Sequence, residues 1–442
     1  MSESRRVLGV FDATSMVTGN MIGSGIFLLV GFAAEPVSGN LSLILAWVIG
    51  GLMALMGAFC IAELSTRFPQ TGGDFIYLHK VYGPFPSFLY GWMSLVIFQT
   101  GSTAVLASFS AKYLLQFIPQ LQFLSVPALA SLVLVFFTTI HCFKVQIGSR
   151  FQSILTIIKV LGIFLMVSLL LSAQTVNSPA PILDTDPSNP YLGFSRALTP
   201  IFFAYTGWNC AGYIAGEISN PRKTLPIALI GGTFITTIIY AIVNYSFINT
   251  LGLYNMKGQE MVPLQALNSV GASHWSGFLS LLILISVMSS LSIHTQTAAT
   301  RVIQAMGQQG IFFKFIGKTS PRFYTPVNAL MVQAAWTIGL MFLLDIENLV
   351  DSTTVVMIMF SALSISTLFK IDRSTKDSSI YKIPLFPLIP LIYIISAIFI
   401  CWGVIQYHLS QNSYLPFWGL FFLISGSIIF YIWRKFYDNE QT

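Results

Sequence analysis

Residues 18–27 read TGNMIGSGIF, and residues 202–216 read FFAYTGWNCAGYIAG. Both stretches lie inside long apolar segments, and each of them contains three glycines. Glycine weakens a helix because it has no side chain to restrict the unfolded backbone. The sequence therefore predicts two apolar helices that are broken near their midpoints. Close packing against a neighbouring helix is the alternative explanation for such glycines.

The composition of the whole chain indicates a membrane protein. Of its 442 residues, 55% are hydrophobic and only 9% are charged, and the mean hydropathy is +0.75. An average soluble protein contains about 25% charged residues. The net charge of +6 does not indicate nucleic-acid binding, because the Lys and Arg residues stand in ones and twos at the ends of apolar segments.

Cysteine and histidine usage gives no sign of a metal site or of any other cofactor. The five histidines are far apart in the sequence, and the cysteines lack the paired spacing of metal or redox motifs. We therefore expect no metal and no cofactor, and we interpret the cysteines as structural residues. They are Cys60, Cys142, Cys210 and Cys401.

Segments of about 20 mostly apolar residues, the length that crosses a bilayer, can be marked along the whole chain. They predict an all-α polytopic membrane protein with about twelve transmembrane helices. The segments are residues 11–33, 41–64, 86–111, 122–141, 150–172, 196–216, 226–250, 275–303, 326–345, 350–370, 384–407 and 414–434.

Lys and Arg residues orient the predicted helices, because cytoplasmic loops of membrane proteins carry an excess of positive charge. If the N-terminus is cytoplasmic, the opposite side holds only Lys112, Arg196 and Lys257. The loops on that opposite side carry acids instead. We therefore expect a multi-pass protein of the cell membrane, inner or plasma, with cytoplasmic tails at residues 1–10 and 435–442.

The two broken helices are the first and the sixth of the predicted spans, so they lie five helices apart. Glycine-interrupted helices at corresponding positions of two halves are a sequence indication of a transporter's binding site. Freed amides from Ser24 to Ile26, at the start of a half-helix, suit a carboxylate. Freed carbonyls near Phe203, Ala204 and Thr206 suit an ammonium group. The candidate substrate-binding residues are Ile22, Gly23, Ser24, Gly25, Ile26, Phe203, Ala204, Thr206 and Asn209.

Four stretches of the sequence carry a resemblance to a known group of proteins. They are GNMIGSGIF from Gly19, AELSTRFPQTGGDFIYLHKVYG from Ala62, FAYTGWN from Phe203 and EISNPRKTLP from Glu217. On these motifs the chain resembles the amino acid–polyamine–organocation superfamily, and within it the L-type amino acid transporter branch. The resemblance implies alternating access, sodium independence and often exchange of substrates.

The resemblance also implies an architecture. It is the LeuT-like core of two inverted repeats of five helices, here residues 11–172 and 196–370, with helices one and six broken. Two further helices follow, in residues 384–434. The loop around Gln120 has no cysteine, whereas animal relatives that join a glycoprotein subunit carry one there, so we expect no disulfide-linked heavy-chain subunit.

Three residues receive roles in coupling or gating. The resemblance implies that Phe203 is the aromatic gate over the substrate, with ordinary packing as the alternative. Lys159 lies about 13 Å deep by the helical rise, and the resemblance implies that its ammonium stands in for a sodium ion. Snorkelling to the cytoplasm is its alternative role. His294 is a candidate coupling residue because histidine titrates near neutral pH, with hydrogen-bonded packing as the alternative.

Partners for two kinds of charged group can also be named. We expect the Lys159 ammonium to bond backbone carbonyls near Gly19 and a hydroxyl on the eighth span. The candidate hydroxyls are those of Ser289, Ser292 and Thr295. Glu63 and Glu217 lie near arginines at the cytoplasmic ends of their helices, and we expect them to form gate or interface ion pairs.

The substrate class follows from what the predicted pocket lacks. No acid occupies the positions of Thr206 or Asn209, so neutral amino acids are favoured over cationic ones. A proton-coupled symporter and a cationic amino acid or polyamine antiporter remain as alternatives. A membrane-embedded enzyme or a channel would need clustered acids or histidines, an activated nucleophile, or repeated polar rings, and the sequence does not contain them.

Overall fold

The computed structural model describes residues 6, 8–23, 25–143, 146–172, 190–296, 298–322, 325–374, 377–411 and 415–439. Within these ranges the chain is helical and contains no strand, apart from one isolated bridge between Leu8 and Ile218. The all-α prediction is confirmed for this part of the chain.

The elements follow one another without a sheet. The first half contains α1 (Val10–Met21), α2 (Gly25–Leu28), α3 (Val30–Ala34), α4 (Asn40–Arg67), α5 (Asp74–Tyr82), α6 (Pro84–Met93), the π-helix η1 (Ser94–Phe98), α7 (Gln99–Phe117), η2 (Pro119–Leu121), α8 (Val126–Cys142) and α9 (Gln146–Ser172). The second half contains α10 (Pro190–Ala204), α11 (Cys210–Tyr213), η3 (Ala215–Glu217), α12 (Pro221–Met256), α13 (Val262–Ser269), η4 (Ser273–Trp275), α14 (Ser276–Gln296), α15 (Ala298–Gln308), α16 (Val327–Leu343), α17 (Ile346–Ser366), η5 (Thr367–Phe369), α18 (Leu388–Ser410) and α19 (Leu415–Asn439).

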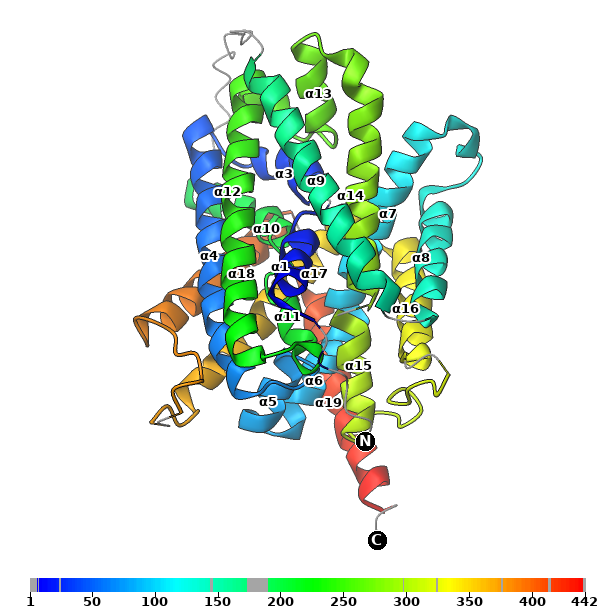
Figure 1. Ribbon diagram of the computed structural model, residues 1–442, viewed down its shortest axis with the longest axis vertical. Coiled ribbons are helices and arrows are strands. Elements are labelled where there is room, and N and C mark those ends of the chain that lie inside the picture. The colour runs from blue at the N-terminus through cyan, green and yellow to red at the C-terminus, as the bar shows by residue number, and fades with distance from the viewer. Residues whose placement is uncertain are drawn as a thin grey trace.

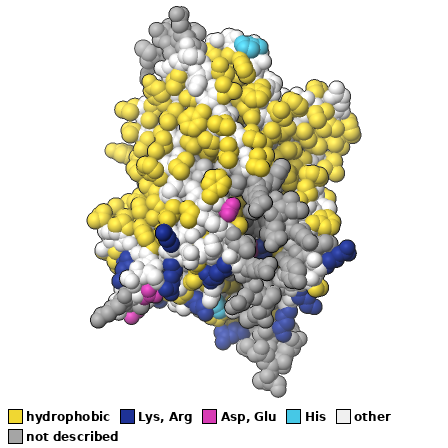
Figure 2. Space-filling view, in the orientation of Figure 1, with side chains coloured by type: hydrophobic (Ala, Val, Ile, Leu, Met, Phe, Trp, Pro, Cys, Tyr) yellow, Lys and Arg dark blue, Asp and Glu magenta, His cyan; other side chains and the backbone are white. Residues whose placement is uncertain are grey.

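The chain is a multi-pass membrane protein. Among the described residues, seven helices are long and apolar enough to cross a bilayer, and α8 and α16 are apolar but shorter. Many large hydrophobic side chains on these helices are exposed. Figure 2 shows them as a broad hydrophobic band over the upper and middle parts of the face in view. Such a surface suits lipid, because lipid tails do not penalise exposed apolar groups.

Long helices surround a centre that holds the first broken helix (Figure 1). In that view α4, α12 and α14 run along the length of the molecule, and α1 lies between them. The short helices α3 and α13 lie toward the upper end, whereas α5, α15 and the end of α19 lie at the lower end. Lys and Arg side chains gather toward the lower end of the same view (Figure 2). The lower end is therefore the one that the charge pattern of the sequence assigns to the cytoplasm.

Both glycine-rich stretches interrupt their helices. The first interruption lies between the end of α1 at Met21 and the start of α2 at Gly25. The second lies between the end of α10 at Ala204 and the start of α11 at Cys210. Within the second, Gly207 has a φ of +100°, a left-handed conformation that favours glycine over residues with a side chain.

Ion pairs tie the lower end together. Glu63 is fully buried on α4 and lies 2.8 Å from both Arg67 and Arg373. Glu217 of η3 lies 2.9 Å from Arg301 of α15. The expectation of ion pairs at Glu63 and Glu217 is confirmed, although two of the arginines come from distant parts of the chain.

Candidate functional site

A buried cavity lies between the two helix interruptions. It brings together six residues that the sequence analysis singled out, namely Gly23, Gly25, Phe203, Ala204, Thr206 and His294. The other lining residues are Asn20, Met21, Ser102 and Leu106, which the sequence analysis did not name. Ser102 and Leu106 come from α7 and His294 from α14, so two further helices line the cavity.

Three of the expected residues are not among those lining the cavity. Ile22 and Ile26 are fully buried in the protein interior. Asn209 lines a neighbouring cavity, which shares Thr206 with the first one. Ser24 lies outside the described residues, and its expected role stays a prediction.

The two interruptions lie in direct contact, and glycines allow this. A Cβ atom added to Gly25 would lie 2.4 Å from Ala204 Cα, closer than any real contact. A Cβ added to Gly207 would lie 2.5 Å from the Nδ2 atom of Asn20. Each interruption therefore needs glycine where it meets the other, which is a packing requirement in addition to any contact with a ligand.

The interruptions leave backbone amides and carbonyls without partners inside their own helices. The first amides of a helix have no acceptor inside that helix, and α2 begins at Gly25. These amides also carry the partial positive charge of the helix end, which suits an anion such as a carboxylate.

The freed carbonyls have protein donors. The Tyr240 hydroxyl on α12 donates to the carbonyl oxygens of Met21 and, at 3.1 Å, of Ala204. The Phe203 carbonyl accepts from the Thr206 amide at 2.9 Å. A carbonyl oxygen has two lone pairs, so those of Phe203 and Ala204 can each accept one further donor, whereas Met21 also accepts from the Gly23 amide at 2.8 Å. Tyr240 was missed by the sequence analysis, and its only signal there was a hydroxyl in an apolar segment.

Lys159 on α9 is buried and donates hydrogen bonds to backbone carbonyls at the first interruption. Its Nζ atom donates to the carbonyl oxygens of Gly19 and Ile22, both at 3.0 Å, and to Ser290 Oγ at 3.1 Å. An ammonium group has three N–H donors, and all three have acceptors here. The carbonyl partner near Gly19 is confirmed, and the snorkelling alternative does not describe this structure.

The hydroxyl partner of Lys159 differs from the expected ones. It is Ser290, whereas Ser292 contacts His141 and Thr295 donates to its own helix. Successive residues of a helix point about 100° apart, so only one side of α14 faces the ammonium. Ser286, one turn earlier on that side, also donates to the Ile22 carbonyl, at 3.2 Å.

Two side chains of the cavity are available to a ligand. His294 is 6% exposed, and its Nε2 atom has no hydrogen-bond partner among the described residues. Buried polar groups are nearly always hydrogen-bonded, so this nitrogen is placed to bond a molecule in the cavity. Phe203 is 3% exposed and lines this cavity.

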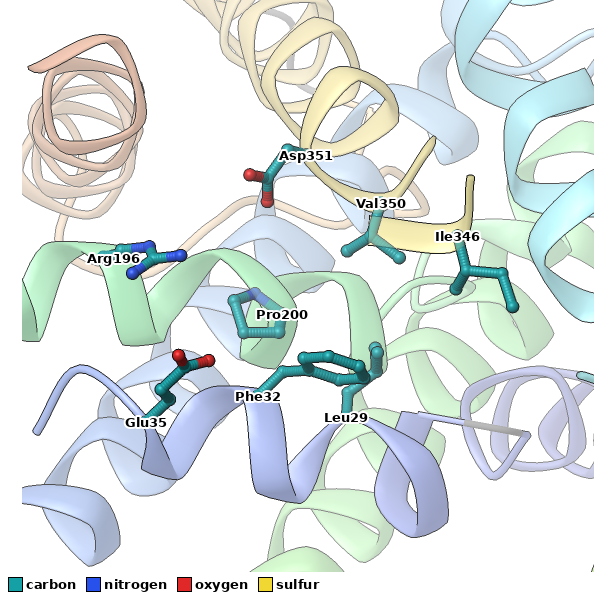
Figure 3. Close-up of a pocket in the computed structure, with 8 residues that line it drawn as sticks. All are labelled: Leu29, Phe32, Glu35, Arg196, Pro200, Ile346, Val350 and Asp351. Atoms are coloured by element: carbon teal, nitrogen blue, oxygen red, sulfur yellow. The ribbon is translucent and has the colours of Figure 1, made fainter. Parts of the chain in front are cut away.

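A second pocket lies about one helical turn farther along both broken helices. Figure 3 shows Leu29 and Phe32 facing Pro200 of α10. Leu29 is four residues after Gly25, and Pro200 is three residues before Phe203. Arg196 stands there between Glu35 and Asp351 (Figure 3). This pocket places charged groups at the upper approach to the buried cavity.

Comparisons with known proteins cover nearly the whole chain. A family model described as "Amino acid permease" matches residues 8–430. The serine/threonine exchanger SteT of Bacillus subtilis (strain 168) is 27% identical over 408 residues, covering 90% of each chain. The b(0,+)-type amino acid transporter 1 of Mus musculus is 26% identical over 439 residues, covering 97% of this chain and 88% of the relative. The cystine/glutamate transporter of Homo sapiens is 26% identical over 449 residues, covering 98% and 86%.

The contact at Gly25 gives a test of the packing. We expect Gly25→Ala to lower the melting temperature of the purified protein, because an overpacked contact costs about 1–3 kcal/mol. Gly339→Ala on α16 is the matched control, since a Cβ added there meets nothing within 4 Å. Equal melting temperatures for the two variants, measured by intrinsic fluorescence or thiol-reactive dye, would contradict the close contact.

Proposed function

Because the chain belongs to the amino acid permease family and is an amino acid transporter, not an enzyme, we propose that it exchanges neutral L-amino acids without sodium. The observation that carries this proposal is the buried cavity between the two helix interruptions. It offers helix-start amides near Gly25 for a carboxylate, and carbonyls near Ala204 for an ammonium group. These are the two groups that every α-amino acid carries.

The neutral class follows from the side chains around the cavity. Besides backbone, its walls offer a hydroxyl at Thr206 and Ser102, an amide at Asn20 and the unpartnered nitrogen of His294. No carboxylate is among the lining residues of this cavity within the described chain. A cationic side chain would enter such a site without a counter-charge, which favours neutral over cationic amino acids and polyamines.

Sodium independence is supported by Lys159. Its ammonium lies among oxygen atoms of the kind that bind a cation, namely the carbonyls of Gly19 and Ile22 and the hydroxyl of Ser290. A fixed positive charge there removes the need for a cation to be bound and released in each cycle.

We infer alternating access by two inverted repeats, residues 11–172 and 196–370, with twelve spans in all. The packing supports this, because α4 lies along α12 and α7 lies along α14. In the proposed order these pairs are helices two and seven, and three and eight, so each helix packs against its own counterpart. Phe203 is buried, and Glu217 pairs with Arg301 at the lower end, which supports a closed arrangement.

The same proposal includes the surroundings of the protein. Both termini lie in the cytoplasm and the protein resides in the cell membrane, as the gathering of Lys and Arg at the lower end supports (Figure 2). No disulfide-linked subunit is required, because the loop around Gln120 has no cysteine. Proton-coupled symport is the alternative that a driving-force experiment separates from exchange.

Exchange is tested with purified protein in liposomes. Vesicles loaded with unlabelled serine, alanine or leucine are expected to take up labelled neutral amino acid several-fold faster than empty vesicles. Loading with arginine or putrescine should give no such increase, and replacing sodium by choline should change nothing. Uptake that needs sodium, or that follows a proton gradient without any effect of internal substrate, would overturn the proposal.

Phe203 gives a test of the gate. We expect Phe203→Ala to weaken substrate binding by about tenfold or more, because a phenyl ring closing over the substrate buries apolar surface worth about 1.5–3 kcal/mol. Phe194→Ala on the same helix is the control, since Phe194 is not among the residues lining the cavity. Equal effects of the two variants on KM would show that Phe203 only packs against its neighbours.

Lys159 gives a test of the fixed charge. Lys159→Met keeps bulk but removes the charged donor to the carbonyls of Gly19 and Ile22, and a hydrogen bond from a charged group is worth about 1.5–3 kcal/mol. We expect substrate binding weaker by tenfold or more. Lys159→Ala should behave alike. Normal exchange by both variants in sodium-free buffer would show that the amine is dispensable.

A further inference from the structure

A second buried acid lies outside the cavity described above. Asp74 is the first residue of α5 and is 3% exposed. Its Oδ2 atom accepts hydrogen bonds from the Tyr213 hydroxyl at 2.9 Å and from Asn209 Nδ2 at 3.1 Å. The Tyr90 hydroxyl of α6 lies 3.5 Å from the same oxygen. Three separate elements, α5, α6 and the segment leading into α11, therefore meet at one carboxyl group.

No positive charge accompanies Asp74, unlike the other fully buried acid in this region. Glu63 has Arg67 and Arg373 at 2.8 Å. Within the described chain, none of the ion pairs found involves Asp74, and none of its polar contacts comes from a lysine, arginine or histidine. An isolated buried carboxylate costs several kcal/mol, whereas a buried neutral acid does not carry that cost.

The titratable groups described on the surrounding elements do not supply Asp74 with a positive charge. Tyr77 on α5, Tyr90 on α6, Tyr213 on α11 and Tyr393 on α18 face Asp74 as neutral phenols. His79 of α5 has its pKa lowered by burial and so adds no charge. The remaining charges are engaged or exposed: Arg301 of α15 pairs with Glu217, Lys370 beside η5 lies over the Tyr82 ring, and Lys80 of α5 is exposed.

Two polar atoms near this group are unsatisfied together. Asp74 Oδ1 has no hydrogen-bond partner in ordinary geometry among the described residues, and neither has Ser364 Oγ of α17. Ser364 is nevertheless close enough to Asp74 to affect the pKa of its carboxyl group. A proton on Oδ1 turns that oxygen into a donor, and the serine oxygen is an acceptor beside it. One proton thus removes both the unpaired charge and the two unsatisfied atoms.

Asp74 also lines a cavity of its own. This cavity is walled mainly by aromatic rings, including Phe98, Phe202 and Trp208, and it touches the substrate cavity only through Thr206. Burial in these surroundings raises the pKa of Asp74 above its usual value, and the hydrogen bond from Tyr213, the nearby hydroxyl of Ser364 and the hydrogen bond from Asn209 partly oppose the rise.

We propose that Asp74 is a proton-binding site whose Oδ1 atom carries a proton in this closed arrangement and loses it to water when the segment around α11 moves away from α5. Its proton comes from, and returns to, the lower end of the molecule, because Asp74 begins α5, which lies at that end (Figure 1). On the proposed orientation that end faces the cytoplasm, so protons do not cross the membrane.

The direction of the effect follows from burial. The closed arrangement binds the proton more tightly than a hydrated, open one, so a proton stabilises the closed arrangement. Acidification of the cytoplasm should therefore slow opening toward the cytoplasm, and alkalinisation should speed it. External pH should have no effect through this site. The link to transport rests on the proposed function, whereas the protonation of Asp74 does not.

Infrared difference spectroscopy of the purified full-length protein tests protonation directly. We expect the carbonyl band of a protonated carboxylic acid at neutral pH, lost on titration to alkaline pH and absent from Asp74→Asn. Asp372→Asn is the matched control, because Asp372 is exposed and its pKa is lowered by hydrogen bonds from Ser374, so its removal should leave the band intact. A neutral-pH spectrum without this band, or a band that survives Asp74→Asn, would overturn the proposal.

A second variant, Ser364→Ala, keeps the carboxyl group of Asp74, so this test does not depend on whether Asp74→Asn folds. The variant removes the acceptor of the proton on Oδ1, so the infrared band should persist and shift to higher frequency. An unshifted band would exclude the proposed contact.

Tyr213→Phe removes a donor to Oδ2 that favours the charged form of Asp74, so the titration of Asp74 should move to higher pH. A titration unchanged in that variant would count against Asp74 as the titrating group.

Transport measurements in right-side-out vesicles then test the coupling. Exchange by the unmodified protein should fall as the internal pH is lowered, and Asp74→Asn should lose this dependence. Equal dependence in both proteins would refute the role of Asp74 in opening. A failure of exchange itself, with the infrared band present and assigned to Asp74, would refute the proposed function and leave the proton site standing.

Discussion

A broken helix inside a membrane leaves backbone carbonyls and amides without partners, and lipid cannot supply them. The protein must therefore provide donors for these groups, and most features of its centre follow from that requirement. Lys159 and Ser290 serve the carbonyls of the first interruption, and the Tyr240 hydroxyl serves one carbonyl from each interruption. The cavity lies between the two interruptions, with Gly25 and Ala204 among its lining residues.

The need to share partners also brings the two interruptions into contact. The Tyr240 hydroxyl on α12 can reach the carbonyls of both Met21 and Ala204 because Gly25 lets the two interrupted segments approach each other. Gly207 makes the reciprocal contact with Asn20. Binding site and packing interface are therefore the same surface. A substrate that separates or draws together the two interruptions acts directly on the contact that holds the centre closed.

Buried charges in this protein are handled in three ways. Lys159 is surrounded by carbonyl and hydroxyl oxygens, and Glu63 is paired with two arginines that fasten α4 to a distant loop. Asp74 has only neutral donors, on elements that belong to opposite halves of the chain. The first two arrangements are satisfied with the charge in place. The third is satisfied only when the charge is removed, and this difference separates a structural acid from one that responds to protons.

The sequence by itself determined the helical class and both interruptions, because these depend on local composition and on where glycine weakens a helix. The Gly19 contact of Lys159 followed from the role that the family resemblance implies. Only the tertiary structure decided which side chains complete the site. Ser290, and not one of the expected hydroxyls nearby on α14, bonds Lys159. One residue along a helix turns a side chain by about 100°, and a helix that is apolar on most sides does not show in its sequence which side faces inward. Asp74 joined Asn209 because a short helix outside the membrane folds under the second interruption, and no spacing along the chain encodes a contact between residues so far apart.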